Sequence, residues 1–557
     1  MPFSLARRAM LTLFGGGAMV AASTAQREGA RNSGAADTST AQPIADTPPA
    51  TGIRTIYGHN RQAGTWRWTE GDFAERVAAD PLGGLTVRHA TTPPGRGAWV
   101  REWDGTVGRA EWFGARADDA DFDNVPAIQA ALDLCPTVQL GAGIYHVRAG
   151  LRIERSGTRL LGAGITQTDQ GENRGATEIV CSNPSATILQ IGSDSQRQPG
   201  RLVETVQLQD FTVRRSVAPF IPSEGFAGAI GIALRWCVNC HIDRVFSIDS
   251  ARGWHFYGTI ENYVRHCSAL RGIAGTLAAK DFFIGFHLDY DAPLGTNGGN
   301  ASLYFDHVRA FGGYGRGTPR MAYSAGLRTD GGWVDLFINA LETGAVDYGI
   351  HGVGDGGSAL SFRTEDLIVS NCVLDMSRLA GIQLESAGPN CAVQIANCYC
   401  AVAPSGTAIV LFNLGGSVSL TGNQYIMGEH GGTALSAVAV SNLRSTGNIC
   451  TRFRQAIYLE RVSGFHIADT IQAVFTANDY PAIGLVDCTR GKIDTIITAR
   501  PGAVTAGIEF KRTASRRVEV NLTAIDVGGA PALIEMGKRV AQPGPFGAGN
   551  TATGLPG

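Results

Sequence analysis

The sequence has little charge, and the charge it has is nearly balanced. Charged residues make up 17% of the 557 residues, and the formal net charge is −2. This argues against a nucleic-acid partner, because neutralising phosphates requires a basic surface that the composition lacks. Beyond Ala22, no stretch approaches the ~20 apolar residues that a membrane-spanning helix needs. The composition therefore predicts a large buried core and no stable membrane span.

The cysteines do not predict a disulfide framework. Their number is odd, at 11, and most lie in apolar strand-like contexts, as Cys372 and Cys398 do. Such cysteines are expected to be buried thiols. Cys237 and Cys240 form one CxxC pair, followed by His241, but no second pair lies at zinc-site spacing. No metal site is expected there.

The N-terminal segment has the pattern of an export signal. Arg7 and Arg8 precede the apolar run from Ala9 to Ala22, and small residues follow as far as Ala25. This order predicts a signal peptide and a periplasmic or extracellular location, with a membrane anchor as the alternative. The paired arginines match the twin-arginine export route loosely.

A four-residue phrase recurs from residue 231 almost to the end of the chain. It consists of a small residue, an apolar residue, any residue and, usually, a second apolar residue. Its copies begin at Gly231, Gly253, Gly285, Gly326, Gly349, Gly381, Ala408, Ala434, Ala456, Ala482, Gly507 and Ala532. The spacing predicts a unit of about 25 residues, and the longer intervals among the early copies indicate insertions.

The repeat predicts an all-β fold, a parallel β-helix of about 11–13 coils. Apolar residues alternate with period 2 within each unit, which excludes a helical solenoid, and so small a unit must stack on its neighbours to bury its apolar face. Each unit also places Asn, Asp or His at a corner, where they tolerate a left-handed conformation. These residues are Asp210, Asp243, His266, Asp306, Asp335, Asn371, Asn397, Asn423, Asn448, Asp469, Asp494 and Asn521.

The N-terminal end of such a stack needs a cover. Asn124–Leu132 is predicted to be a short capping helix, because Pro126 suits the first turn and the apolar residues follow helical spacing. Val138–Val147 and Thr158–Gly164 alternate as strands of the first coils should.

Several segments at this end resemble the opening of the pectin-lyase-like superfamily. They are Trp112–Ala115, Asp118–Asp119, Ala127–Leu132, Gly141–Tyr145 and Leu161–Gly164. The sequence is most similar to the rhamnogalacturonase and epimerase-like pectate lyase group, which includes phage tailspike depolymerases. This resemblance implies a right-handed parallel β-helix and action on polysaccharides. It supplies no catalytic residues, because the Asn-Thr-Asp and Arg-Ile-Lys motifs of polygalacturonases are missing and only His351–Gly352 matches their His-Gly element.

Strand alternation predicts where the chemistry lies. The second and fourth residues of the phrase face inward, so the third and fifth are expected to face solvent on one sheet. In the copies from Gly253 to Gly381, these positions hold acids, histidines and an arginine. Long insertions in the same units are expected to form the walls of a groove.

The candidate residues come from these columns and insertions. The catalytic candidates are Asp330, the first choice, with Asp289, Glu385, His287, Arg328 and His351. The substrate-binding candidates are His255, Tyr257, Tyr314, Arg316, Arg320, Tyr323 and Gln383. Five loop or turn carboxylates could replace the chosen acids, namely Glu342, Asp347, Asp355, Glu365 and Asp366.

Paired carboxylates predict an exported enzyme that hydrolyses glycosidic bonds. Neighbouring strands lie ~4.8 Å apart, so Asp289 and Asp330 are expected one coil step apart, which suits a retaining or an inverting glycosidase. The alternative is a lyase in which Arg328 neutralises a uronate while His287, His351 or Tyr257 removes its C5 proton. A non-catalytic glycan-binding or tailspike-like protein is the third hypothesis.

The remaining expectations concern cofactors, assembly and organisation. No cofactor is expected, except that a lyase could hold calcium with Asp289, Asp291 and Asp330. The partner is a polysaccharide, and the chain is a monomer or, because later units have an apolar outward face, a homotrimer. We assign residues 1–25 to the signal peptide, 26–52 to a flexible linker, 53–107 to an N-terminal extension, 108–537 to the β-helix and 538–557 to a tail.

Overall fold

The computed structural model describes most of one compact unit, Ile44–Gly557. The described residues are 44–49, 52–56, 62–166, 175–196, 201–271, 280–289, 300–313, 321–354, 365–387, 391–427, 432–473, 479–511, 515–522, 525–540, 544–546 and 550–553. The predicted signal peptide and most of the linker lie outside them, as do the candidates Tyr314, Arg316, Arg320, Asp291 and Asp355. No helix among the described residues is long and apolar enough to cross a membrane.

A small antiparallel sheet precedes the repeat. Its strands, in the order β1-β2-β4-β3, are β1 (Ile53–Ile56), β2 (Gly64–Glu70), β4 (Gly97–Arg101) and β3 (Thr86–Val87). The helices η1 (Ile44–Asp46), α2 (Ala74–Ala79) and η3 (Pro94–Arg96) accompany it. This sheet has a core of its own, made by Ile44, Ile56, Trp66 and Trp99.

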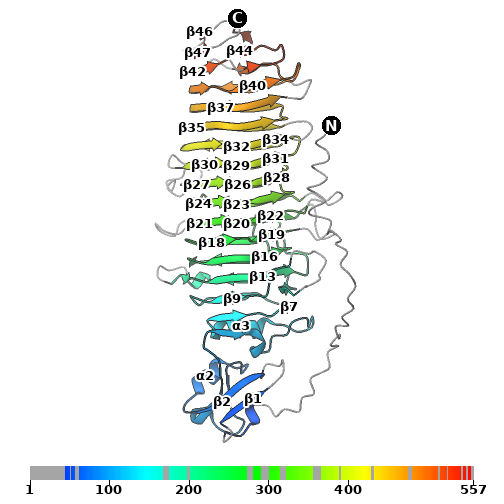
Figure 1. Cartoon of the computed structure of the whole chain (residues 1–557), viewed down its shortest axis with the longest axis vertical. Coiled ribbons are helices and arrows are strands. Elements are labelled where there is room, and N and C mark those ends of the chain that lie inside the picture. Colours follow the sequence, from blue (N-terminus) through cyan, green and yellow to red (C-terminus); the bar gives the residue numbers. More distant parts are fainter. Residues whose placement is uncertain are drawn as a thin grey trace, which may run out of the picture. The chain divides into compact units, whose positions relative to one another are not determined.

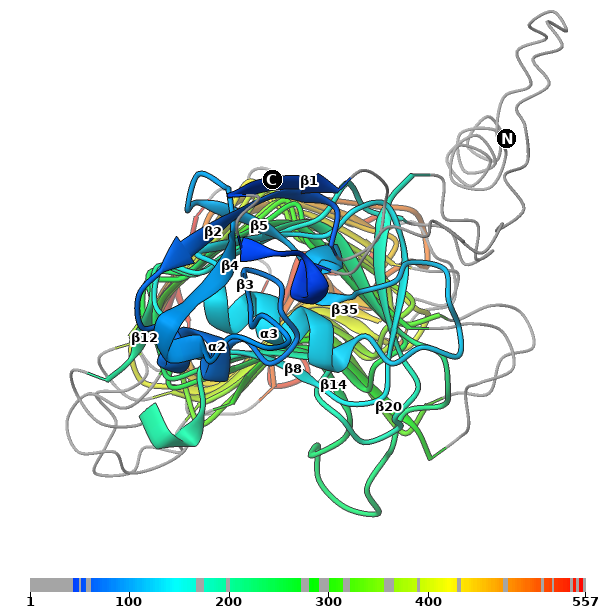
Figure 2. The ribbon, with the colours of Figure 1, turned by 90° about the horizontal axis from the view of Figure 1, so that it is seen from below.

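The rest of the unit is a stack of parallel strands in three columns (Figures 1 and 2). The first, here called the site column, contains β8 (Leu151–Ile153), β11 (Leu189–Ile191), β14 (Ile230–Arg235), β17 (Arg252–Tyr257), β20 (Phe282–Asp289), β23 (Tyr323–Asp330), β26 (Tyr348–Val353), β29 (Ala380–Ala387), β32 (Thr407–Leu414), the start of β35 (Thr433–Thr451), β36 (Gln455–Glu460), β38 (Ile483–Val486), β41 (Ile508–Phe510) and β44 (Leu533–Glu535). Every copy of the repeated phrase lies in this column.

The other two columns complete each coil. The second contains β5 (Val107–Arg109), β6 (Thr137–Gln139), β9 (Arg159–Leu161), the starts of β13 (Gln207–Arg215) and β16 (His241–Ile248), β18 (Tyr263–Arg265), β21 (Ala301–Asp306), β24 (Val334–Asn339), β27 (Asp366–Ser370), β30 (Ala392–Ala396), β33 (Ser417–Thr421), the middle of β35, the start of β37 (Ser463–Ala473), β39 (Thr489–Ile493), β42 (Arg516–Asn521) and β47 (Asn550–Thr553). The third contains β7 (Gly143–Val147), β10 (Thr177–Cys181), the ends of β13 and β16, β19 (Ser268–Leu270), β22 (Arg309–Phe311), β25 (Glu342–Gly344), β28 (Val373–Ser377), β31 (Tyr399–Val402), β34 (Gln424–Met427), the ends of β35 and β37, β40 (Ile496–Ala499) and β43 (Ile525–Asp526). The predicted all-β stack of parallel coils is confirmed.

A few short elements decorate the stack. The helices η4 (Ala110–Phe113) and η5 (Asp194–Gln196) lie in loops, and β12 (Val203–Glu204) pairs in parallel with β15 (Cys237–Val238). β45 (Lys538–Arg539) and β46 (Gly544–Phe546) pair antiparallel with β44 and β47. The helix α3 spans Val125–Leu134, and four of its side chains, including Ile128 and Leu132, belong to the main core cluster.

The small first residue of the phrase has a steric cause. A Cβ atom at Gly253 would lie 2.5 Å from the Cβ of Ala269, and one at Gly285 would lie 2.5 Å from the Cβ of Ala310. Ala269 and Ala310 belong to the third column, so the chain enters the site column in close contact with a neighbouring column. A larger side chain at these positions would force the two columns apart.

The predicted corner residues follow two different patterns. Asp210, His266, Asn371 and Asn397 have positive φ, as expected for a left-handed corner. Asp335 was placed at this corner wrongly: Asn339 pairs with Asp306 there, and Asp335 lies near the start of β24. Asp335 also has positive φ, but at the start of the strand and not at the corner that ends it.

Farther along the stack, the corner side chains turn inward. Asn423, Asn448 and Asp469 are almost fully buried. The Oδ1 of Asn448 accepts from the backbone N–H of Asn423 at 2.8 Å, and its Nδ2 donates to Asp469 Oδ1 at 2.8 Å and to the carbonyl of Leu420 at 3.1 Å. These bonds join three successive coils inside the core.

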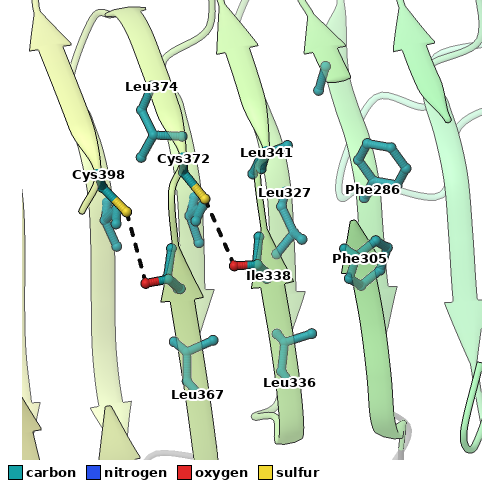
Figure 3. Packing of buried hydrophobic residues seen from close by; sticks show 14 of the residues in the cluster. Phe286, Phe305, Leu327, Leu336, Ile338, Leu341, Leu367, Cys372, Leu374 and Cys398 are labelled. Atoms are coloured by element: carbon teal, nitrogen blue, oxygen red, sulfur yellow. Dashed lines mark hydrogen bonds between the residues drawn. The ribbon is translucent and has the colours of Figure 1, made fainter. Parts of the chain in front are cut away.

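The core of the stack is made of apolar side chains and thiols. All eleven cysteines are buried and unpaired, as predicted. Figure 3 shows Cys372 and Cys398 among leucine and phenylalanine side chains, with their thiols directed at the carbonyls of Ile338 and Val369. A thiol in this setting packs like a small apolar side chain. The ring of His241, next to the CxxC pair, stacks on Tyr263.

Removing the buried amide of Asn448 should destabilise the stack. Asn448→Ala removes the acceptor of the buried Asn423 N–H and the side-chain donor to the Leu420 carbonyl and Asp469, and each buried group left unsatisfied costs about 1–3 kcal/mol. We expect the free energy of unfolding, measured in urea, to fall by roughly 3 kcal/mol. The control Thr421→Ala, at an exposed position of the preceding coil, should change it by less than about 0.5 kcal/mol. Equal losses in both variants would contradict a structural role for the buried amides.

Candidate active site

The two predicted columns of side chains are present on the site column. Strand pairing aligns the third positions of successive phrases as His255, His287, Arg328, His351 and Gln383. It aligns the fifth positions as Tyr257, Asp289, Asp330, Val353 and Glu385. The predicted register is therefore confirmed, and Asp289 and Asp330 are direct neighbours on β20 and β23.

The third-position side chains are not solvent-exposed, and that part of the prediction is wrong. His255, His287, Arg328 and His351 are 1%, 2%, 9% and 7% exposed. Aromatic side chains cover part of this row. The ring of Phe226, in the segment between β13 and β14, lies 4.8 Å from that of Tyr323 and 6.4 Å from that of His287, and the ring of Tyr348 stacks on His351 at 4.3 Å. The guanidinium of Arg328 lies 4.5 Å from the centre of the Phe226 ring.

Histidines and carboxylates pair diagonally across neighbouring strands. His255 Nε2 lies 3.2 Å from Asp289 Oδ2, His287 Nε2 lies 2.8 Å from Asp330 Oδ2, and His351 Nε2 lies 3.0 Å from Glu385 Oε1. In each pair the histidine lies at a third position and the carboxylate at the fifth position of the next coil. An ionised carboxylate only accepts hydrogen bonds, so each Nε2 carries the hydrogen and each Nδ1 is the unprotonated nitrogen.

Arg328 joins these pairs into one network. Its Nε and Nη2 donate to the two oxygens of Asp330 at 2.9 and 2.5 Å. Its Nη1 donates to the hydroxyl of Tyr323 at 2.7 Å and to His351 Nδ1 at 3.0 Å. The hydroxyl oxygen of Tyr323 also lies 2.8 Å from His351 Nδ1. Four of the five N–H groups of the guanidinium thus donate to protein groups.

Burial keeps the three histidines neutral. Burial lowers the pKa of His255 to about 3. It also lowers the pKa of His287, and the pKa of His351 is lowered first by burial and then by the positive charge of Arg328. Because the ordinary pKa of histidine is about 6.5, all three rings are uncharged at neutral pH.

The two cavity carboxylates are held ionised, but by different partners. Burial acts to raise the pKa of Asp330, but hydrogen bonds from His287 and Arg328 and the charge of Arg328 outweigh it and lower that pKa strongly. Burial likewise opposes the shift at Asp289, whose pKa is lowered by the hydrogen bond from His255 and nearby positive charge. Asp330 has a bidentate guanidinium and Asp289 does not, so the ionised form of Asp330 is the better stabilised.

These groups line a cavity of about 550 Å³. Its lining residues are Asp194, Phe226, Ala227, Arg235, Trp236, Arg252, His255, Tyr257, His287, Asp289 and Asp330. Trp236 and Tyr257 form an aromatic wall, with ring centres 5.3 Å apart at nearly right angles. The cavity combines acids, neutral imidazoles and aromatic rings, the groups that bind sugars.

Five of the predicted residues meet in this cavity, and four form a second group beside it. His255, Tyr257, His287, Asp289 and Asp330 line the cavity. Tyr323, Arg328, His351 and Glu385 form the adjoining network, part of it under Phe226. Gln383 lies one coil beyond His351 and is not among the cavity residues.

The four replacement carboxylates that the structure describes do not line the cavity. Glu342 forms an ion pair with Arg309 on the third column. Asp347 is buried and accepts a hydrogen bond from Arg378. Glu365 and Asp366 lie at the start of β27 in the second column and are not among the lining residues. Among the candidate carboxylates, Asp289 and Asp330 are therefore the two that line the cavity.

Arg252 was not among the predicted site residues. It is 6% exposed and lines the cavity. Its Nη1 lies 3.5 Å from His287 Nδ1 and 3.9 Å from Asp289 Oδ2, and burial lowers its pKa to about 10. Arg252 directly precedes the phrase, where alternation predicts an inward side chain. Ile284 is the equivalent residue on β20 and packs beside Phe226. The alternation of inward and outward side chains therefore breaks at the glycine that follows each of these residues.

One group of donors could approach a metal ion. A ligand atom of each of His255, His287 and Asp289 lies within 4.8 Å of the others. The guanidinium of Arg252 already places a positive charge between His287 and Asp289. Calcium also prefers oxygen ligands, whereas two of these donors are imidazoles. The set does not match the calcium site considered for a lyase.

No family model matches the chain, and no curated protein matches it significantly. Among solved structures, 68 chains are similar. Tailspike protein 3 of bacteriophage CBA120 has 14% identity and a TM-score of 0.43, over 81% of this chain and 64% of the tailspike, so this chain spans less than two thirds of it. The A-module of a mannuronan C-5 epimerase of Azotobacter vinelandii has 17% identity and a TM-score of 0.42, over 77% of this chain and 98% of the module.

A surface adhesin of Streptococcus pneumoniae has 13% identity and a TM-score of 0.42, over 74% of this chain and 92% of the adhesin. Identity and TM-score are low throughout, so the chemistry of this chain must be argued from its own residues.

Removing the guanidinium of Arg328 should destabilise the protein in a pH-dependent way. The lowered pKa of folded Asp330 contributes stability above the unfolded pKa of about 3.9, and this contribution is lost as pH falls through the folded pKa. We expect Arg328→Met to lower the free energy of unfolding at pH 7 by roughly 3 kcal/mol and by less near pH 2, where folded Asp330 begins to lose this contribution.

Urea unfolding at both pH values tests this expectation. The control Arg309→Met breaks an exposed ion pair with Glu342 and should cost less than about 1 kcal/mol. An equal loss at both pH values in Arg328→Met would show that Asp330 is not stabilised by this guanidinium.

Proposed function

We propose that this chain is a carbohydrate-active enzyme that hydrolyses glycosidic bonds of a polysaccharide bound against the site column. The observation that carries the proposal is the pair Asp289 and Asp330. These two carboxylates are direct neighbours on adjacent strands, face one cavity and have different hydrogen-bond partners. Adjacent strands are ~4.8 Å apart, close to the carboxyl separation of about 5–5.5 Å in retaining glycosidases.

Asp330 is assigned the role of nucleophile or base. Both roles need an ionised carboxylate. The bidentate contact with Arg328 and the hydrogen bond from His287 stabilise that form and fix the direction of the carboxylate. Such a group is a poor proton donor, so Asp330 cannot be the general acid at neutral pH.

Asp289 is assigned the role of general acid in the complex. Its hydrogen-bond partner His255 is neutral, and Arg252 approaches it only to 3.9 Å. Burial is the largest influence on its pKa and acts to raise it. Its side chain is 37% exposed, so a bound sugar that displaces water buries it further and moves its pKa upward. Carboxyl groups whose environments differ in this way divide into acid and base.

The proposal keeps the finer parts of the sequence prediction. These are export from the cytoplasm, the right-handed sense of the coil and the role of α3 as a cap. Among the neighbours in fold, one tailspike is described as a capsular polysaccharide depolymerase. We propose a polysaccharide as the substrate of this chain as well, and the cavity on the site column is the feature that supports this.

Hydrolysis is favoured over β-elimination because Arg328 is engaged. A lyase needs a cation that neutralises the sugar carboxylate, and Arg328 would have to leave Asp330, Tyr323 and His351 to provide it. The proposed hydrolysis uses Asp289 and Asp330 and needs no metal ion. Calcium belongs to the lyase alternative.

The first test is turnover of a panel of acidic and neutral polysaccharides by the wild-type protein. We expect new reducing ends without the ultraviolet absorbance of an unsaturated uronate, and no loss of turnover with a chelator. Reducing ends together with that absorbance would indicate a lyase. The absence of both signals on every polysaccharide would favour a binding protein.

Single substitutions should then locate the chemistry. Asp330→Asn and Asp289→Asn should each lower kcat roughly a thousandfold, because a positioned acid or base contributes about 10²–10⁴. The control Glu460→Gln changes a carboxylate at the same phrase position on β36, outside the cavity, and should leave kcat unchanged. Unaltered unfolding midpoints would show that the variants fold. Full activity in either aspartate variant would remove that residue from the mechanism.

The pH profiles should report the shift at Asp289. The profile of kcat/KM reflects the free enzyme and that of kcat reflects the complex. The pKa of Asp289 is lowered in the free protein and should rise when a sugar buries it. We therefore expect the alkaline limb of kcat at a higher pH than that of kcat/KM. Coincident limbs would contradict Asp289 as the acid.

A further inference from the structure

We infer that the sugar residue taken by this cavity carries no acidic group, an inference that rests on the proposed function. The cavity exposes more negative than positive charge. The side chains of Asp194, Asp289 and Asp330 are 69%, 37% and 27% exposed, whereas those of Arg235 and Arg252 are 26% and 7% exposed. A ligand in the cavity therefore meets carboxylates first.

The guanidinium groups at the cavity are already engaged. Arg235 Nη1 contacts both oxygens of Asp194 at 3.1 Å. Arg252 donates through Nε to the carbonyl of Gly228 at 3.3 Å and lies deep between His287 and Asp289. Arg328, behind the cavity, holds Asp330 through both carboxylate oxygens. Both guanidinium groups of the described lining residues therefore lie beside a protein carboxylate, Arg235 beside Asp194 and Arg252 beside Asp289, which offsets their charge.

The histidines do not compensate for this charge. Each Nε2 already donates to a carboxylate of the protein, so the rings have no second N–H for a ligand unless they gain a proton. Gaining that proton is opposed because His255 and His287 are almost fully buried.

What the cavity offers is hydrogen-bond acceptors beside aromatic rings. Each of Asp289 and Asp330 has oxygen lone pairs left after its bonds to the protein. Sugar hydroxyl groups are donors that can fill them, and Tyr257 and Trp236 provide apolar surface for the ring. A uronate would instead bring a third carboxylate close to two ionised ones. The site therefore selects a neutral residue by rejecting an anionic one.

The inference is tested with oligosaccharides that differ only in the acid group. Oligomers of galacturonate, mannuronate and glucuronate are each paired with the carboxyl-reduced oligomer, in which CH₂OH replaces the carboxylate. Binding to the wild-type protein is measured by isothermal titration calorimetry at low ionic strength. We expect at least one reduced oligomer to bind, and to bind at least tenfold more tightly than its acidic partner.

Two further measurements assign the cause of this preference. Added salt should narrow the difference in affinity between the reduced and the acidic oligomer, because salt screens exposed charges. Asp289→Asn and Asp194→Asn should narrow it as well, whereas Glu460→Gln should not. A steric preference would be unchanged by salt.

An acidic oligomer that binds as tightly as its reduced partner would overturn the inference, and so would the failure of every reduced oligomer to bind. Neither result decides whether the chain is a hydrolase, because that is read from turnover in the aspartate variants. A hydrolase that selects uronates and a neutral-sugar binder without turnover are therefore distinguishable outcomes.

Discussion

The fold and the site depend on the register between successive coils. Parallel backbone hydrogen bonds hold each strand beside the equivalent strand of the next coil, about 4.8 Å away. Residues more than thirty positions apart in the sequence, such as His255 and Asp289, therefore become contacts. A shift of one residue would exchange inward and outward side chains along a whole strand. The apolar second and fourth positions of the phrase oppose such a shift.

Register alone places the site residues in rows, and burial then determines their charge states. The third positions from His255 to His351 are buried, so His255, His287 and His351 remain neutral. The carboxylates lie one step nearer to solvent and stay ionised through hydrogen bonds from those rings. One strand register thus produces two rows of different chemistry, neutral donors within and negative acceptors at the surface. The diagonal pairing between the rows is what orients each acid.

Arg328 and Arg252 show why nearly identical coils differ in chemistry. Arg328 occupies a third position that holds histidine in three neighbouring coils, and it gives Asp330 a bidentate partner that Asp289 lacks. Arg252 precedes its phrase and approaches Asp289 only to 3.9 Å. A repeat scaffold can therefore assign unlike roles to equivalent carboxylates by changing one neighbour. The charge balance of the cavity follows from the same two arginines, since both are engaged by protein groups.

The sequence by itself determined the parallel coils, the buried thiols and the alignment of His287 with Arg328 and of Asp289 with Asp330. These follow from a local period that repeats, and period and register are written in each unit. Only the tertiary structure decided that the third positions are buried, that Arg252 enters the site and that Asp330 is held ionised. Those facts depend on aromatic side chains packed over the row, among them Phe226 outside the repeat, on hydrogen bonds between coils, and on a break in alternation at a glycine. Distant contacts of this kind leave no periodic trace, so reading one strand at a time cannot find them.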